Sequence, residues 1–154
     1  MFLFPISDDN ESNTRPYVCY VLISICCFIF LWQSTLPTNL NQEAIYNFGV
    51  IPAAVLGTQT SLIDPYLTIF TSMFMHGGWM HLIGNMVFLW IFGDNIEDSM
   101  GHKKFLAFYL ICGTFAASLQ ISIDPNSTIP MIGASGAIAG LLGAYLVLHP
   151  KANV

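Results

Sequence analysis

Four long apolar runs constrain what this chain can fold into more than any other feature. Each run approaches the ~20 residues that an α-helix needs to cross the hydrocarbon core of a bilayer. Only 8% of the 154 residues are charged, against about 25% in an ordinary soluble domain, which is too few to cover a water-soluble globule. The sequence predicts an all-α, polytopic membrane bundle whose transmembrane helices span about residues 16–34, 79–96, 105–123 and 132–148.

Charge and cysteine placement exclude several other classes of protein. The net charge is −5, and nucleic acid is therefore not an expected partner, because its phosphates require clustered Lys and Arg. The cysteines all lie inside apolar runs, where we interpret them as small buried hydrophobic residues rather than disulfides or zinc ligands; they are Cys19, Cys26, Cys27 and Cys112. His76 and His81 have no third ligand of suitable type nearby in sequence, so we predict neither a metal nor a cofactor.

The first apolar run and the cations predict how the chain is oriented. A secretory signal peptide is the competing interpretation of this run, but the residues before it are acidic, and bulky Phe30 to Trp32 occupy the place of a cleavage site. We therefore expect a retained helix that follows a cytoplasmic tail at residues 1–15. The few cations all fall on one side of such a bundle, which is the cytoplasmic side by the positive-inside rule; they are Arg15, Lys103, Lys104 and Lys151.

A long loop at residues 35–78 separates the first two spans on the non-cytoplasmic side. It contains the apolar stretches EAIYNFGVIPAAVL and PYLTIFTSMFMH, which are too short or too interrupted by proline to cross a bilayer. We expect short helices that lie in the membrane interface or pack against the bundle. A loop of this length is more often functional than not.

Three polar residues at membrane depth indicate chemistry, because such residues are costly there. His81 and Asn85 are spaced i, i+4 and share one helix face. The second and fourth spans both begin on the loop side, so Ser135 lies at a similar depth, and the three side chains converge. Gly133 and Gly136 flank Ser135 and let a substrate backbone approach, and a helix N-terminus favours an oxyanion. This set indicates a serine nucleophile beside an oxyanion hole.

Each of these features also has a purely structural interpretation. Histidine and asparagine in a transmembrane span often form hydrogen bonds that hold neighbouring helices together. Glycines spaced 3, 4 and 3 apart form a small-residue stripe that packs helices closely whatever Ser135 does; they are Gly133, Gly136, Gly140 and Gly143. Composition alone does not separate these interpretations from catalysis.

Taken together, two segments resemble the rhomboid family of intramembrane serine proteases. The first is MFMHGGWMHLIGNMVFLWIFGDNIEDSMG, and the second, about 30 residues later, is GASGAIAGLLGAYLVLHPKANV. The likeness covers about Asp64 to Val154. It implies a rhomboid-like helical bundle of six expected spans, of which this chain holds about four, in residues 16–154.

The resemblance assigns a role to each matching residue. It implies that Ser135 is the catalytic nucleophile and that His81 and Asn85 are the oxyanion-side residues. His76 matches a loop histidine just before the second span, and Glu97 matches a structural acid at its cytoplasmic end. The implied reaction is hydrolysis of peptide bonds in or near the transmembrane segments of substrate proteins. The implied setting is a lipid bilayer, which we expect to be the bacterial plasma membrane, with the N-terminus cytoplasmic.

The chain departs from the family pattern in two places. Leu67 and Thr68 stand where some bacterial members have a Trp-Arg pair. The larger departure is the general base, which the family takes from a histidine on its sixth helix. His149 is roughly 21 Å along the helix from Ser135, and His102 lies in the cytoplasmic turn, so neither replaces that base.

The sequence therefore predicts an incomplete copy of a serine endopeptidase with little activity as an isolated chain. A non-catalytic rhomboid-like protein that binds transmembrane segments is the alternative. A His-lined transporter would show inverted-repeat symmetry, and we find none in the sequence.

Overall fold

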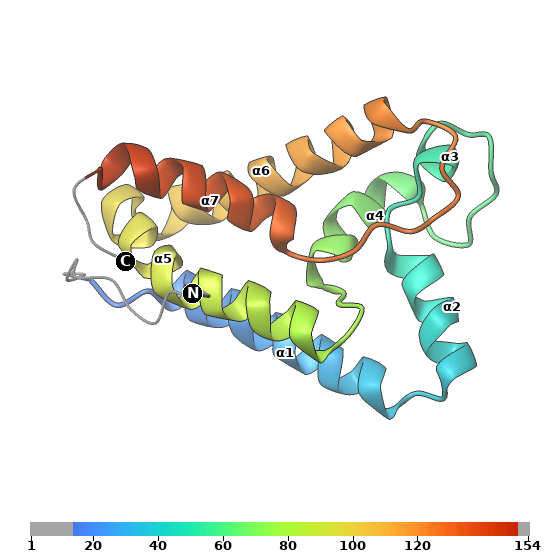
Figure 1. Ribbon diagram of the computed structural model, residues 1–154, viewed down its shortest axis with the longest axis horizontal. Coiled ribbons are helices and arrows are strands. Elements are labelled where there is room, and N and C mark those ends of the chain that lie inside the picture. Colours follow the sequence, from blue (N-terminus) through green and yellow to red (C-terminus); the bar gives the residue numbers. More distant parts are fainter. Residues whose placement is uncertain (1–13, 151–154) are drawn as a thin grey trace, which may run out of the picture.

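The computed structural model describes residues 14–150, and within them it is an all-α bundle without β-strands (Figure 1). Lys151 and most of the predicted tail lie outside the described residues. The elements are α1 (Tyr17–Thr35), α2 (Thr38–Phe48), α3 (Pro52–Val55), α4 (Pro65–Thr71), the 3₁₀-helix η1 (Ser72–Phe74), α5 (Trp79–Met100), α6 (His102–Ile123) and α7 (Ser135–Leu148). The long loop folds into α2, α3, α4 and η1, as expected.

Helices occupy all the predicted spans, with shifted bounds. Within the described residues, α1 and α6 are long and apolar enough to cross a membrane, whereas α7 is apolar but shorter. Helix α5 runs on to Met100, four residues past its predicted end, and carries His81, Asn85 and three acidic residues. The spanning of α5 and α7 stays a prediction, while the all-α architecture of the described residues is confirmed.

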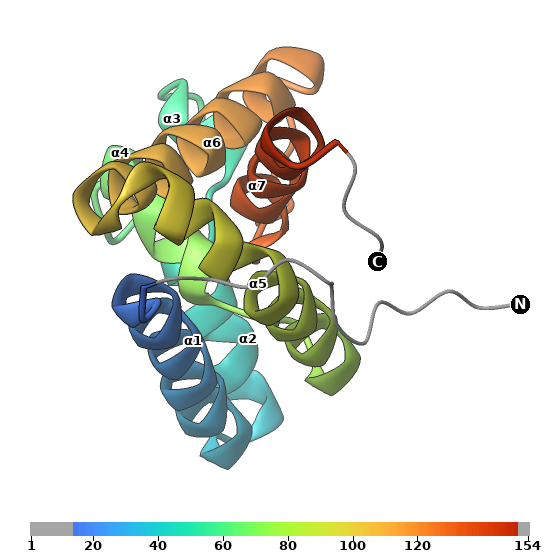
Figure 2. The same ribbon diagram turned by 90° about the vertical axis from the view of Figure 1, so that its left-hand side faces the viewer.

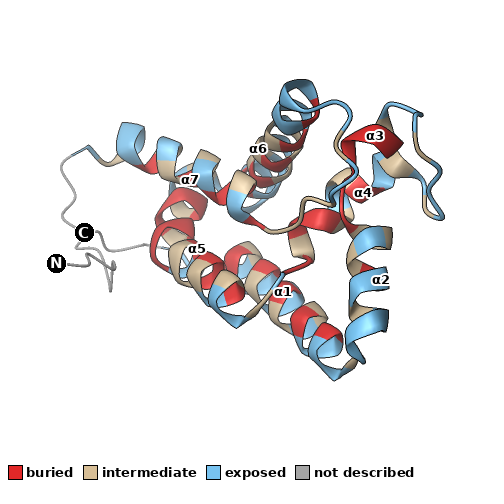
Figure 3. Ribbon diagram, turned by 45° about the vertical axis from the view of Figure 1, so that its right-hand side comes forward, coloured by how far each residue is buried: buried red, intermediate tan, exposed pale blue. Residues whose placement is uncertain are grey.

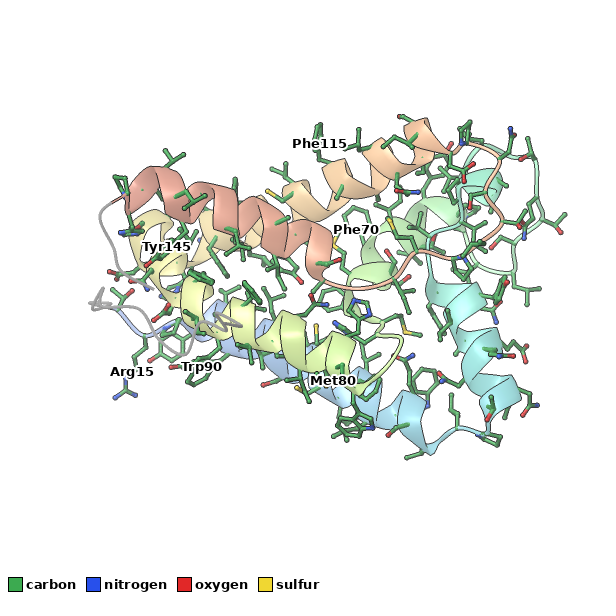
Figure 4. The ribbon with its side chains drawn as sticks, in the orientation of Figure 1. Arg15, Phe70, Met80, Trp90, Phe115 and Tyr145 are labelled. Carbon is green, nitrogen blue, oxygen red and sulfur yellow. The ribbon has the colours of Figure 1, made fainter. Side chains whose placement is uncertain are left out.

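Helix α5 is the centre of the bundle, between α1 and α7, and α7 lies along α6 (Figure 2). Buried residues follow the faces where these helices meet, and exposed residues cover the outer faces (Figure 3). Many of the exposed side chains are large and apolar, and Figure 4 shows Phe115 projecting outward from α6. An apolar exterior around an apolar core is what a lipid environment requires.

Glu97 ties the start of α1 to the end of α5. Helix α1 begins after Pro16, which offers no side-chain cap, so its first backbone N–H groups need other acceptors. The Glu97 carboxylate is fully buried and accepts from the N–H groups of Val18 at 2.9 Å and Cys19 at 2.8 Å. His102 at the start of α6 contacts the same carboxylate. Glu97 thus joins three helices at one end of the bundle.

Two glycines let α7 approach α6 closely. A Cβ on Gly136 would lie 2.5 Å from the Ala116 Cβ, and one on Gly140 would lie 2.3 Å from the Cys112 Sγ. Gly143 has open space instead. Of the four glycines in the stripe, Gly136 and Gly140 therefore pack against α6, Gly133 faces α5, and Gly143 packs against neither.

Backbone hydrogen bonds attach the segment before α7 to the long loop. Val50 and Met131 exchange two bonds in an isolated antiparallel bridge, at 3.0 and 2.9 Å. The Gly133 N–H donates to the Ser72 carbonyl at 2.8 Å. Because these groups are paired with the loop, the chain there is not helical, and α7 begins at Ser135 rather than at residue 132.

We expect Gly140→Ala to lower the free energy of unfolding by about 1–3 kcal/mol, because the added methyl overpacks against Cys112. Gly143→Ala on the same helix is the matched control and should be neutral or slightly stabilising. The measurement is reversible unfolding of each variant in detergent micelles. Equal stability of the two variants would contradict the close α6–α7 contact.

Candidate active site

Ser135 is the first residue of α7, and its side chain is exposed. The residue before it, Ala134, is buried and provides no side-chain cap. The first helical bond of α7 runs from the Ile138 N–H to the Ala134 carbonyl, so the N–H groups of residues 135–137 have no acceptor within the helix. A serine hydroxyl therefore lies beside free backbone donors and the positive end of a helix dipole.

His81 and Asn85 both face the backbone two residues before Ser135. A Cβ on Gly133 would lie 2.5 Å from the His81 Nε2 and 3.6 Å from the Asn85 Nδ2. Gly133 has a φ of +117°, a conformation that favours glycine. The structure thus brings the predicted polar pair of α5 to the entrance of α7.

The donors of this pair are free to bind an incoming group. Asn85 is 8% exposed, and its Nδ2 finds no hydrogen-bond partner among residues 14–150. The His81 Nδ1 accepts the Gly77 N–H at 3.4 Å. A neutral imidazole whose Nδ1 accepts carries its proton on Nε2, which is the nitrogen that faces Gly133. Both side chains therefore present N–H groups toward Gly133.

His76 supports His81 from the loop. Its ring is 1% exposed, its Nδ1–H donates to the Phe74 carbonyl at 3.3 Å, and its ring centroid lies 5.1 Å from that of His81. Burial, and then the neighbouring His81, lower the pKa of His76 to about 4. His76 is therefore neutral at physiological pH, and it places no positive charge beside His81.

The remaining predicted residues do not face this cluster. Gly136 packs on α6, and Glu97 lies at the opposite end of α5 from His81. His149 lies at the far end of α7 and contacts Ser99, and His102 contacts Glu97. Neither histidine faces Ser135.

Sequence reasoning missed Gln33, whose buried side chain holds the backbone of His76. A polar residue at the end of the first apolar run was the available signal. The free-energy cost of burying a polar side chain in a membrane segment, which drew attention to His81 and Asn85, applies to Gln33 as well.

This arrangement suits acyl transfer. An exposed hydroxyl, free helix N–H groups and two side-chain donors gather around one turn of backbone, and such donors stabilise the oxyanion of a tetrahedral intermediate. The described residues contain no group of three or more His, Cys, Asp or Glu side chains placed to hold a metal ion.

Comparison with known proteins identifies sequences to which this chain is similar. Residues 64–154 match the model of the Rhomboid domain family. The chain is 30% identical over 136 residues to Rhomboid protease GluP of Bacillus subtilis (strain 168), covering 87% of this chain and 25% of that protein. It is 32% identical over 136 residues to presenilin-associated rhomboid-like protein, mitochondrial, of Bos taurus, covering 86% and 33%. The chain thus spans a third or less of the length of these curated relatives.

We expect Gly133→Ala to displace His81 as well as to strain the backbone. Gly57 also has a positive φ, of +77°, but has open space around it, so Gly57→Ala should cost only the backbone strain of about 1–2 kcal/mol. Gly133→Ala should cost more and should shift the ring resonances of His81 in NMR spectra. Unchanged His81 resonances in a folded Gly133→Ala variant would contradict the contact.

The depressed pKa of His76 makes stability depend on pH. Between pH 6.5 and about 4, the unfolded state binds a proton that the folded state does not, so the free energy of unfolding falls as the pH is lowered through this window. His76→Gln removes that titration, and the slope in this window should be smaller in the variant than in the parent chain. Identical slopes from parallel unfolding titrations would show that His76 is not buried as a neutral ring.

Proposed function

The chain belongs to the rhomboid family, and from this premise we propose that it carries the nucleophile and oxyanion hole of an intramembrane serine endopeptidase. The observation that carries the proposal is the position of His81 and Asn85 against Gly133, two residues before Ser135. Its substrates are transmembrane proteins, cleaved in or near their membrane segments. The reaction uses no cofactor.

In the proposed first step, the Ser135 oxygen attacks the carbonyl carbon of the scissile peptide bond. The hydroxyl proton passes to a general base, and the carbonyl oxygen becomes an oxyanion. The His81 Nε2–H, the Asn85 Nδ2–H and the Ser135 backbone N–H donate to that oxyanion. Collapse of the tetrahedral intermediate breaks the C–N bond while the general base passes that proton to the leaving nitrogen. The free amine departs, an acyl group remains on Ser135, and water then hydrolyses this acyl group.

The described histidines do not supply the base of this step. His81 presents Nε2–H toward Gly133 and is a donor there. His76 is buried behind it, and His102 and His149 lie at the opposite end of the bundle. We therefore propose that the base comes from elsewhere, as the family resemblance implies, and that this chain alone is a weak hydrolase.

We further propose that the N-terminus is cytoplasmic and that the membrane is the bacterial plasma membrane. The start of α1 lies beside the start of α6, since the rings of Tyr17 and His102 are 5.7 Å apart. This places Arg15 at the same end as Lys103 and Lys104, which supports the orientation. The bacterial relative supports the location, although mitochondrial relatives match over a similar length.

A non-catalytic protein that binds transmembrane segments is the second candidate. Its support is the exposed apolar surface of α7, where Leu146 and Val147 are 72% and 78% exposed. Reactivity of Ser135 separates it from the first candidate, because a binding role requires no activated serine.

A fluorophosphonate probe tests the proposal. We expect slow labelling that is selective for Ser135, roughly 10²–10⁴-fold slower than a complete serine hydrolase because no base assists it. Asn85→Ala should slow it further, because the phosphoryl oxygen loses a donor. Exposed Ser118 on α6 is the internal control for non-specific labelling.

Three outcomes would contradict the proposal or part of it. Equal labelling of Ser118 and Ser135 would favour the binding protein, as would labelling of Ser135 that does not depend on Asn85. Labelling as fast as a complete serine hydrolase would instead show that a histidine of this chain acts as the base.

A further inference from the structure

Gln33 forms an unusually complete set of hydrogen bonds at the end of α1. Its side chain is 1% exposed. Its Oε1 accepts the His76 N–H at 3.1 Å, and its Nε2 donates to the His76 carbonyl at 3.1 Å and to the Asn41 Oδ1 at 3.3 Å. The two N–H bonds of the amide and its oxygen are all used, so the orientation of the amide is fixed.

These bonds hold both the N–H and the carbonyl of His76, as a neighbouring β-strand would. The backbone that leaves His76 is that of Gly77, whose N–H donates to the His81 Nδ1. Gln33 is therefore linked to His81 in two steps: it holds the backbone of His76, and the next residue, Gly77, donates its N–H to His81. No part of this path depends on the ring of His76.

We propose that Gln33 is a positioning residue, which holds His81 with its Nε2–H directed at Gly133 through the backbone of His76 and Gly77. The significance of that N–H as an oxyanion donor rests on the proposed function, whereas the positioning itself does not. The side chains that face His81 along this path are the ring of His76 and the amide of Asn85, and neither carries a charge at neutral pH. The position of His81 therefore depends on hydrogen bonds rather than on an ion pair.

Glutamine suits this task for a chemical reason. The backbone of His76 presents one donor and one acceptor on the same side, and a primary amide matches both at once. Methionine has a similar shape but forms neither bond, and glutamate offers only acceptors when it is ionised. Variants with methionine or glutamate at position 33 therefore distinguish the effect of packing from the effect of hydrogen bonding.

Hydrogen exchange and NMR of the chain in detergent micelles test the proposal without any reaction. In the parent chain, the amides of His76 and Gly77 should both be protected. Gln33→Met should raise the exchange rate of both amides by about ten-fold or more, the value of one lost hydrogen bond, and should shift the His81 Nδ1 resonance. Gln33→Glu keeps the acceptor for the His76 N–H and should restore much of the Gly77 protection.

Two further variants test whether the effect runs from Gln33 to His81 and whether it is specific to that path. His81→Ala should expose the Gly77 amide and leave the His76 amide protected, because the Gln33 bonds remain. Gln120→Met, at an exposed position near the end of α6, makes the same substitution away from the path and should change neither amide.

The proposal is overturned if a folded Gln33→Met variant loses protection at His76 alone, while Gly77 and the His81 resonance stay as in the parent chain. If Gln33→Met does not fold, Gln33→Glu decides by the same comparison. An unprotected Gly77 amide in the parent chain would also overturn it. The fluorophosphonate experiment does not measure amide exchange or the His81 resonance. The positioning role of Gln33 and the proposed function can therefore fail separately.

Discussion

The bundle depends on two buried polar side chains. One joins the start of α1 to the end of α5, and the other joins the end of α1 to the segment just before α5. Glu97, in the last turns of α5, accepts the first N–H groups of α1, and Gln33, in the last turn of α1, holds the backbone just before α5 begins. An unpaired backbone group is costly where water is scarce, so either helix loses these partners if it slides along the other. The register of the pair is therefore set by hydrogen bonding, and apolar packing fills the space between.

The site is built outward from that fixed pair. The loop that α1 and α5 hold between them supplies Val50 and Ser72, whose backbone groups pair with Met131 and Gly133. The strand-like pairing stops the chain from becoming helical until Ser135. The first turn of α7 thus begins two residues after Gly133, the backbone that His81 and Asn85 face. A change far from Ser135, in the loop or at the end of α1, therefore affects the geometry around the serine.

The sequence predicted those features of the structure that produce a periodic or local pattern of residues. Apolar length predicted the helices, and the i, i+4 spacing of His81 and Asn85 predicted their shared face, which the contact with Gly133 bears out. The start of α7 was misplaced by three residues because bonding to a distant loop outweighs local helix preference there. Gln33 was missed because its partner is the backbone 43 residues away, and a backbone partner leaves no residue type to recognise.

The proposed function assigns the oxyanion donors and the general base to different parts of the protein, and this separation has a physical consequence. A neutral His76, a hydrogen-bonded His81 and a buried Asn85 hold these N–H groups in place without a substrate. In the proposed reaction their preorganisation therefore does not depend on which group takes the proton of Ser135. Electrostatic stabilisation and proton transfer are distinct contributions to the barrier. A chain with the first but not the second should bind an anionic tetrahedral group more readily than it forms one. Affinity for such a group and catalytic turnover are therefore different properties, and the proposed function predicts the first of them for the described residues.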